Sequence, residues 1–525
     1  MEGTPSQEGW FSTWLAGRAG ATAVTVPLAA ITGVALAIRL YLSLTSFCIS
    51  GDGVAYLVMA REFAAGDTGA LLRSVFSPLY PVLITALHWV VPDWEVAGNL
   101  VSALAGSAAV MTIYAMTREV FARRDVALGA AGLAAIHPEL AGYSASVRTE
   151  AGYIFLMTGT VWLLIRSVRT RRVRTAAAAG ALGGLAYLYR TEAIGLPMVG
   201  IAALAAASLV WRECEIRWTI AAAAVFAAAF LVIAGPYLVY LRVSTGHWSV
   251  GREFAAAMMY GMGDAARNGE AWRHLGYARG VSPWTPLFAD PQLYLKKVGS
   301  DLASSAYNFV QALDPMLAMF LAVGLWRRGR ALLASFGEAL LAGLIVFYYC
   351  GFAFSYTGTR FMVHLIPFTF GWVIIGLEDV AATAARVANG AGWRIPPYAI
   401  PVAAALVLLP RTLWPIGYDM RGIRYAGLAI AHRQAKPSAV VARDGRIAWY
   451  AGARFVLLPE RTPGGLCEWI ARQERAGYLV INDHEARGLG LSHTASCLEF
   501  LARYPRGGSG YYDVFAIASS NGAKP

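Results

Sequence analysis

Long apolar blocks constrain the fold of this chain more than any other feature. The clearest is "TIAAAAVFAAAFLVIAGPYLVYL", which begins at Thr219. A helix of roughly 20 apolar residues crosses about 30 Å of hydrocarbon, and several blocks reach that length. Only 14% of the residues are charged, whereas soluble domains usually carry about 25%. The alternating pattern of a transmembrane β-barrel is missing. The sequence therefore predicts a polytopic α-helical membrane protein.

The apolar blocks predict about eleven membrane-spanning helices. Their expected ranges are 22–47, 94–118, 125–141, 147–166, 175–193, 194–211, 218–243, 307–326, 331–354, 359–379 and 396–416. Residues 1–418 would form this membrane-embedded part.

The basic residues predict how the chain is oriented. The net charge is +12, and the positive residues cluster in short turns between apolar blocks, such as "FARRD" from Phe121, "RSVRTRRVR" from Arg166 and "WRRGR" from Trp326. Cytoplasmic loops of membrane proteins carry an excess of Lys and Arg. This pattern argues against nucleic-acid binding. It predicts a multi-pass protein of the inner (plasma) membrane with a cytoplasmic N-terminus, and with loops 48–93 and 244–306 outside.

The residues from 419 to 525 change in character. "SAVVARD", "RIAWYAG", "FVLLP", "GYLVIND" and "GYYDVFAIAS" resemble strands, and "LCEWIARQERA" resembles a helix. Such alternation predicts a small α/β domain, extracytoplasmic on the expected topology. Cys467 and Cys497 lie here and would be able to pair outside the cell. The five cysteines show no metal-binding spacing, and we favour two unpaired small residues over a disulfide.

Ionisable residues at the ends of the predicted spans are candidates for function, because burying them in a membrane is costly. The predicted topology brings both signs of charge to the outer face. The residues are Asp52, Glu139, Arg148, Glu150, Arg190, Glu192 and Arg360. Singly, each is compatible with helix capping, the helix dipole or snorkelling to headgroups. Together they suit a reaction on a phosphate ester, because a carboxylate accepts a hydroxyl proton or holds a metal and arginine binds phosphate.

Several segments, taken in order, resemble the GT-C glycosyltransferases. The similarity is to the bacterial family 39-like group, related to protein O-mannosyltransferases and lipid A aminoarabinose transferase. The matching segments are "SGDGVAYLVMAREFAAGD", "FSPLYPVL", "SASVRTEAGYIFL", "LAYLYRTEAIGLP", "STGHWSV", "GTRFMVHLIPF" and "IAWYAGARFVLLPE". Their order over nearly the whole chain, combined with the topology, carries the resemblance.

The resemblance implies a GT-C fold, a polyprenyl-phosphate-linked sugar donor and roles for particular residues. Asp52 takes the place of the candidate catalytic base, and Glu150 that of a second acid. The positions expected to hold the donor phosphate are Arg148, Arg190 and Arg360, and those expected in the substrate cleft are Tyr56, Tyr80, Glu139, Glu192 and His247. Gly53 follows Asp52 where many relatives have a second acid, so dependence on a divalent metal stays open.

The predicted function is an inverting transfer of a sugar from the lipid-phosphate donor to an acceptor hydroxyl at the outer face. The partners are the donor, the bilayer and an acceptor that is a glycan, lipid or protein. A transporter or lipid-linked sugar flippase is the main alternative, although it would require polar or broken helices at mid-bilayer. A polysaccharide polymerase or ligase and a non-catalytic scaffold are two further alternatives.

Overall fold

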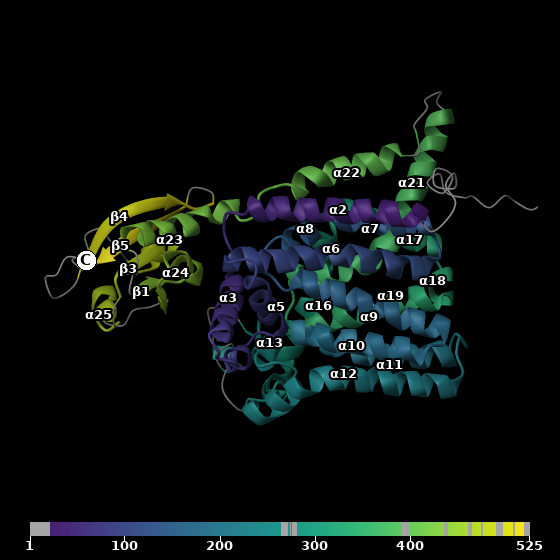
Figure 1. The fold of residues 1–525 in the computed structure, drawn as a ribbon, viewed down its shortest axis with the longest axis horizontal. Coiled ribbons are helices and arrows are strands. Elements are labelled where there is room, and N and C mark those ends of the chain that lie inside the picture. Colours follow the sequence, from purple (N-terminus) through teal and green to yellow (C-terminus); the bar gives the residue numbers. More distant parts are fainter. Residues whose placement is uncertain are drawn as a thin grey trace, which may run out of the picture.

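The computed structural model describes most of the chain. The described residues are 22–263, 271, 272, 275, 281–390, 396, 398–434, 439–459, 465–473, 476–489, 497–507 and 510–518. Long helices form a bundle, and a small domain with a β-sheet lies against one end of it (Figure 1).

Within the described residues, seven helices are long and apolar enough to cross a membrane. They are α2 (Thr22–Leu44), α6 (Trp94–Phe121), α9 (Glu150–Thr170), η1 with α11 (Thr191–Ile194, Gly195–Leu209), α12 (Ile216–Thr245), α19 (Phe336–Phe354) and α20 with η2 and α21 (Thr359–Met362, Val363–Thr369, Phe370–Gly390). Helices α16 (Pro291–Leu313) and α17 (Pro315–Arg328) make an eighth only if counted together, since they meet at 102°. The protein is therefore a multi-pass membrane protein.

The structure differs from the prediction of about eleven spans because three of the expected spans are short. Helices α7 (Arg124–Ile136), α10 (Val173–Tyr189) and α22 (Ala399–Thr412) contain 13, 17 and 14 residues. A helix rises about 1.5 Å per residue, so the shortest extends only about 20 Å. Helix α7 ends at Ile136, and Pro138 starts a separate helix, α8 (Pro138–Ser144). Apolar composition alone did not reveal where these helices end.

Small residues allow the helices to pack closely. A β-carbon on Gly180 of α10 would lie 2.1 Å from the Phe226 carbonyl oxygen of α12. A β-carbon on Gly324 of α17 would lie 1.9 Å from the Trp372 carbonyl oxygen of α21. Membrane helices associate through such close backbone approach, since lipid provides no hydrophobic drive. The many Ala and Gly residues of the apolar blocks thus serve packing as well as insertion.

The two ends of the bundle are different. The end that carries α3 (Gly51–Ala64), α4 (Ala70–Arg73) and α5 (Leu79–His88) lies next to the C-terminal domain (Figure 1); we call it the domain end. Helix α13 (Phe254–Met259), α15 (Thr285–Ala289) and the start of α16 follow α12 there. The opposite end carries the basic turns after α6, α9, α11 and α17; we call it the basic end. The loop 48–93 thus contains two helices of ten residues or more, α3 and α5.

The C-terminal part folds around a five-stranded mixed sheet in the order β2-β1-β3-β5-β4. Its elements are η3 (Tyr418–Met420), α23 (Arg421–Arg433), β1 (Ala439–Ala442), α24 (Gly445–Ala451), β2 (Arg454–Leu457), α25 (Leu466–Ala471), β3 (Tyr478–Asn482), α26 (Asp483–Gly488), β4 (Leu498–Pro505) and β5 (Tyr511–Ile517). Strand β1 pairs in parallel with β2 and β3, whereas β5 pairs antiparallel with β3 and β4. A small α/β domain is confirmed.

One predicted strand in this domain was wrong. "RIAWYAG" forms helix α24 because both of its ends are capped. The Asp444 side chain accepts a hydrogen bond from the backbone N–H of Arg446, and Gly452 adopts φ 64° at the C-terminus. Asp is a favoured N-cap and Gly a favoured left-handed residue after a helix. These two signals outweigh the strand propensity of the residues between them.

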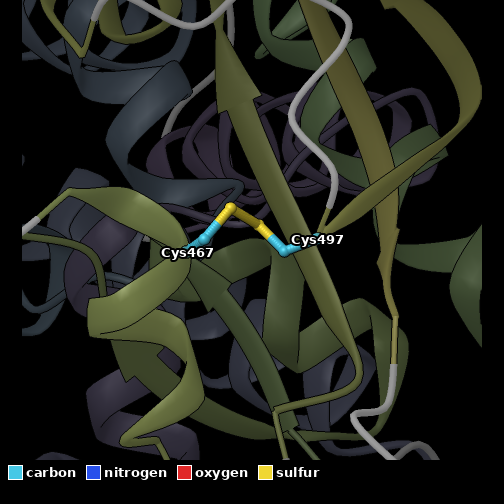
Figure 2. The surroundings of a disulfide bond; sticks show 2 residues. All are labelled: Cys467 and Cys497. Atoms are coloured by element: carbon cyan, nitrogen blue, oxygen red, sulfur yellow. A yellow bond between two sulfur atoms is a disulfide. The ribbon is translucent and has the colours of Figure 1, made fainter.

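The structure joins Cys467 and Cys497 in a disulfide, with Cα atoms 5.7 Å apart. The bond links the start of α25 to the residue before β4 (Figure 2). Our expectation of two unpaired cysteines was wrong. Thirty positions separate the two residues, and only the packing of α25 against the sheet brings them together.

Candidate active site

A continuous ion network occupies the domain end of the bundle. The Arg360 guanidinium donates to both the Asp52 and the Glu150 carboxylates. Arg190 donates to Glu150 over 3.3 Å and to Glu192 over 2.5 Å. These five residues come from the starts of α3, α9, η1 and α20 and from the end of α10. The structure thus brings together two predicted catalytic acids and two predicted phosphate-binding arginines; we call the five the domain-end network.

Local geometry fixes Asp52 in the first turn of α3. Ser50 is the N-cap, and its hydroxyl accepts from the Gly53 N–H over 3.0 Å and donates to the Val147 carbonyl over 2.8 Å. Ser50 therefore caps α3, and the Asp52 carboxylate does not serve as the cap. A β-carbon on Gly53 would lie 2.8 Å from Ile49 Cγ1 and 3.1 Å from the Val147 oxygen. That crowding explains why glycine follows Asp52 here.

Glu150 is the buried centre of the network. Its side chain is 0% exposed, whereas that of Asp52 is 34% exposed. One Glu150 oxygen, Oε1, accepts from both Arg190 and Arg360. The other, Oε2, has no hydrogen-bond partner among the described residues. Buried polar groups are nearly always hydrogen-bonded, so Oε2 is an open acceptor position beside the network.

The three arginines that were predicted to hold the donor phosphate differ in their contacts. Arg190 is 10% exposed, and its guanidinium lies 5.7 Å from the Phe361 ring centroid. Arg360 is 28% exposed and paired with two acids. Arg148 has no ion pair within the described part of the chain, and its guanidinium lies 4.8 Å from the Tyr143 ring centroid. Arg148 is therefore the arginine of this group that is most open to an added anion.

A cavity of about 450 Å³ adjoins the network through Glu192. Aromatic side chains form much of its wall, namely Tyr260, Phe347, Tyr348, Phe352, Tyr356 and Phe361. Its acids are Glu192 and Glu253. Asp52 and Glu150 meet at Arg360 and are not among the residues that line this space. The arrangement is a charged rim beside a mainly apolar pocket.

Glu253, at the N-terminus of α13, was not among the residues that the sequence predicted. It has no ion pair within the described ranges. Burial and the neighbouring charge of Glu192 raise the pKa of Glu253 to about 7. The only sequence signal was an acid in the loop 244–306, without a motif around it. A second acid thus lines the cavity, at a position to which the sequence analysis gave no role.

The two predicted cleft tyrosines are buried beneath the network. Tyr56 is 3% exposed and packs on Phe76 and Tyr80, with ring centroids 4.8 and 5.1 Å away. Tyr80 is 0% exposed, and its hydroxyl donates to the Gly98 carbonyl over 3.0 Å. Neither ring lines the cavity. Their contacts hold α3 and α5 against the bundle.

Two other predicted cleft residues lie apart from the network. Glu139 is on α8, within electrostatic range of Arg148 and Arg411. The His247 ring lies in the turn after α12, where Nδ1 is 3.1 Å from the Thr245 carbonyl oxygen. Neither residue lines the cavity. The structure does not bring these two to the Asp52 carboxylate.

The described side chains do not fit a bound metal ion. The Arg360 guanidinium lies between the Asp52 and Glu150 carboxylates, where a divalent cation would need to be. Among the described residues, no group of three or more His, Cys, Asp or Glu side chains is arranged to hold a metal. The charge compensation of this centre is provided by arginine.

Comparison with known proteins shows which family and which fold the chain resembles. Residues 76–279 match the family model described as dolichyl-phosphate-mannose-protein mannosyltransferase. The crystal structure of ArnT from Cupriavidus metallidurans bound to undecaprenyl phosphate has 18% identity and a TM-score of 0.57, covering 96% of this chain and 100% of that one. The chain therefore has a GT-C fold. The resemblance inferred from the ordered segments is confirmed.

A second solved structure shares the fold of this chain. It is the oligosaccharyltransferase of Archaeoglobus fulgidus in complex with Zn and sulfate, with 14% identity and a TM-score of 0.60. The match covers 86% of this chain and 67% of that one. The same fold is seen in the Archaeoglobus fulgidus protein AglB with an inhibitory peptide and a dolichol-phosphate, at 14% identity and a TM-score of 0.52, covering 90% of this chain and 70% of that one. No curated protein is significantly similar in sequence.

Proposed function

We propose that this protein is a glycosyltransferase, which moves a sugar from a polyprenyl-phosphate-linked donor to an acceptor hydroxyl at the domain end of the bundle, outside the cytoplasm. The observation that carries the proposal is the Arg360 guanidinium joining Asp52 to Glu150. Carboxylates and guanidiniums meet here from helix ends far apart in sequence, beside a cavity that can accept an apolar tail. This pairing of acid–base and anion-binding groups suits transfer from a phosphate ester.

The donor would lie with its lipid tail toward the aromatic wall and its phosphate at the arginines. Among the described residues, Arg148 has no acid partner to release before it meets a phosphate. Arg360 would exchange a carboxylate partner for the donor phosphate, because arginine binds phosphate bidentately. Lipid phosphates are bound by proteins of this fold, undecaprenyl phosphate in ArnT and dolichol-phosphate in AglB.

That exchange of partners couples donor binding to chemistry at Asp52. While Arg360 donates to the Asp52 carboxylate, the guanidinium occupies the carboxylate oxygen that an acceptor hydroxyl would need to reach. A donor phosphate that takes over Arg360 frees Asp52 to accept the proton of the acceptor hydroxyl. The base would thus become active only when donor is in place.

The bond changes follow directly. The acceptor oxygen loses its proton to Asp52 and forms a bond to the anomeric carbon. The bond from that carbon to the phosphate oxygen breaks, and polyprenyl phosphate leaves with the electron pair. Attack opposite the leaving phosphate inverts the anomeric configuration. Arginines aimed at the phosphate stabilise its developing charge, which is often the largest catalytic contribution.

Glu150 would position the arginines in this scheme. Its buried Oε1 holds both Arg190 and Arg360. Its unpartnered Oε2 is available to a hydroxyl of the sugar or the acceptor. The acid therefore orients the phosphate-binding groups and does not need to transfer a proton.

The test is an assay of the purified protein in lipid nanodiscs with a panel of polyprenyl-phosphate sugars. Glycans, lipids and peptides would be offered as acceptors. We expect release of polyprenyl phosphate that depends on acceptor, with a product of inverted configuration. Movement of the intact donor across the bilayer of a proteoliposome without release of polyprenyl phosphate would contradict the proposal.

A further inference from the structure

The segment that precedes Asp52 is held by the C-terminal domain. Residues 47–50 follow the end of α2 and precede α3, and they lie outside any helix or strand. The Phe47 N–H donates to the Ile416 carbonyl over 2.9 Å. Backbone polar groups that are taken from water require partners, and here the partners come from residues about 370–400 positions later in the chain.

Helix α24 binds both sides of Ile49, three residues before Asp52. The Ile49 N–H donates to the Tyr450 hydroxyl over 2.7 Å. The Ile49 carbonyl accepts from the Arg446 guanidinium over 3.4 Å. Ile49 is 2% exposed. The backbone on both sides of this residue is therefore fixed by side chains of the C-terminal domain.

The two side chains are themselves anchored. Arg446 donates to the Asp444 carboxylate, with Nη2–Oδ2 and Nε–Oδ1 distances of 2.5 and 2.9 Å. The Tyr450 hydroxyl lies 3.3 Å from the Glu95 carboxylate of α6. Burial raises the pKa of Tyr450 well above its usual range, so the hydroxyl keeps its proton, donates to Glu95 and accepts from Ile49.

A third contact joins α24 directly to the helix that carries Asp52. The Arg61 guanidinium of α3 lies 4.0 Å from the Trp449 ring centroid, within the range of a cation–π interaction. Helix α24 thus contacts both the segment before α3 and α3 itself, and it lies beside α3 in the fold (Figure 1).

We propose that Tyr450 and Arg446 are positioning residues, which fix the Ile49 backbone and thereby aim the Asp52 carboxylate from the C-terminal domain. This inference rests on the proposed function for the role of Asp52. Misplacement of a reacting group by about 1 Å can cost about 100-fold in rate. Ile49 lies next to the N-cap Ser50, so rotation of its peptide groups would shift the start of α3. Neither Tyr450 nor Arg446 lies among the residues that line the cavity.

The kinetic test uses Tyr450→Phe, which removes the hydroxyl and little else. Tyr425→Phe is the matched control, because Tyr425 is on α23 of the same domain and is 40% exposed. We expect kcat to fall about 10-fold in Tyr450→Phe with donor KM changed less than about 2-fold, since Tyr450 orients the base and does not bind donor. Tyr425→Phe should match the wild type. In an Asp52→Asn background, Tyr450→Phe should cause no further loss.

Two substitutions of Arg446 test whether a hydrogen-bond donor at this position supports the rate. Arg446→Met removes the donor to Ile49 and should lower kcat, whereas Arg446→Lys retains a donor and should recover part of the rate. A purely structural role would lower the yield of folded protein without this ordering in kcat. Equal kcat values for Arg446→Met, Arg446→Lys and wild type would overturn the proposal.

Hydrogen exchange tests the contact without any activity. We expect amides 46–53 to exchange at least about 10-fold faster in Tyr450→Phe than in wild type and in Tyr425→Phe. Unchanged exchange would overturn the proposal, as would faster exchange with unchanged kcat. If the wild type transferred no sugar from any donor, the proposed function would fail by itself. Unchanged exchange would then still refute the hold of Tyr450 on Ile49.

Discussion

The two ends of the helical bundle carry similar residues with different consequences. At the basic end, Arg328 on α17 donates to both oxygens of Glu338 on α19. The Glu338 carboxylate also accepts from the Trp372 indole over 2.9 Å. At the domain end, Glu150 leaves one oxygen without a partner among the described residues. Both acids are buried, with exposures of 1% and 0%.

This difference separates structural ion pairs from a site. Both oxygens of the Glu338 carboxylate accept hydrogen bonds from donors on α17 and α21. Glu338, which is on α19, therefore ties the three helices together. Glu150 holds two arginines, and the network around it reaches both the 34% exposed Asp52 and the cavity. Buried ion pairs occur for structural reasons as well as functional ones. An open acceptor beside a cavity is the feature that marks the domain end.

The largest expected effect on sugar transfer comes from replacing Arg360 at the domain end. Replacing Arg328 at the basic end is the comparison. Arg360→Met leaves Asp52 and Glu150 without their shared cation, and we expect sugar transfer to fall by about 1000-fold or more. Arg328→Met, at a residue of similar exposure (35% against 28%), should destabilise the fold by about 3 kcal/mol. Its transfer rate per folded molecule should stay within about 2-fold of wild type. Turnover and thermal unfolding, measured on the same samples, check both statements.

Equal losses of turnover per folded molecule in Arg360→Met and Arg328→Met would contradict the difference between the two ends. The domain-end network would then be structural, like the pair at the basic end.

A smaller effect is expected from neutralising the two buried acids. Glu150→Gln retains the shape and weakens the hold on Arg190 and Arg360, so we expect kcat to fall about 100-fold. Glu338→Gln should lower the unfolding temperature and leave kcat unchanged. Steady-state kinetics with a lipid-phosphate donor check the pair. A kcat for Glu150→Gln equal to that of Glu338→Gln would remove Glu150 from the account.

The smallest expected effect concerns Glu253. Its pKa is raised to about 7 by burial and by Glu192, so the folded chain binds a proton that the unfolded chain releases from about pH 4.5 upward. The wild type should therefore lose stability as pH rises from about 4.5 through 7. Glu253→Gln removes this loss and should gain about 1–3 kcal/mol relative to wild type at pH 8, and little at pH 5.

Thermal unfolding at both pH values, with the exposed Glu62→Gln as a control, checks this prediction. A difference between Glu253→Gln and wild type that does not change with pH would contradict it.

The sequence revealed much of the site because its residues follow apolar blocks. Asp52, Glu150, Arg190 and Arg360 each stand where a predicted span begins or ends, and topology alone places such ends together. Glu253 could not be found in this way. It lies on a short helix in a long loop, and its surroundings depend on how that loop folds over Glu192. Tyr56 and Tyr80 were expected in the cleft, but helical spacing alone does not reveal which face is covered by α5 and α6.

The fold was predictable where one physical signal dominates. Hydrophobic length identified the long spans, but it also counted α7, α10 and α22 as spans, since a short apolar helix has the same composition as a spanning one. "RIAWYAG" resembles a strand by propensity, although Asp444 and Gly452 cap it as a helix. The pairing of Cys467 with Cys497 depends on the packing of α25, which no local pattern encodes.

The most direct test of the central claim is the transfer rate of Asp52→Asn. This variant retains the size of the side chain and removes the base, and Asp67→Asn on an exposed acid of the same loop is the matched control. With donor and acceptor saturating, the account predicts that Asp52→Asn releases polyprenyl phosphate about 100- to 10,000-fold more slowly than wild type, while donor affinity persists and Asp67→Asn stays at the wild-type rate. A rate for Asp52→Asn equal to that of wild type would contradict the account.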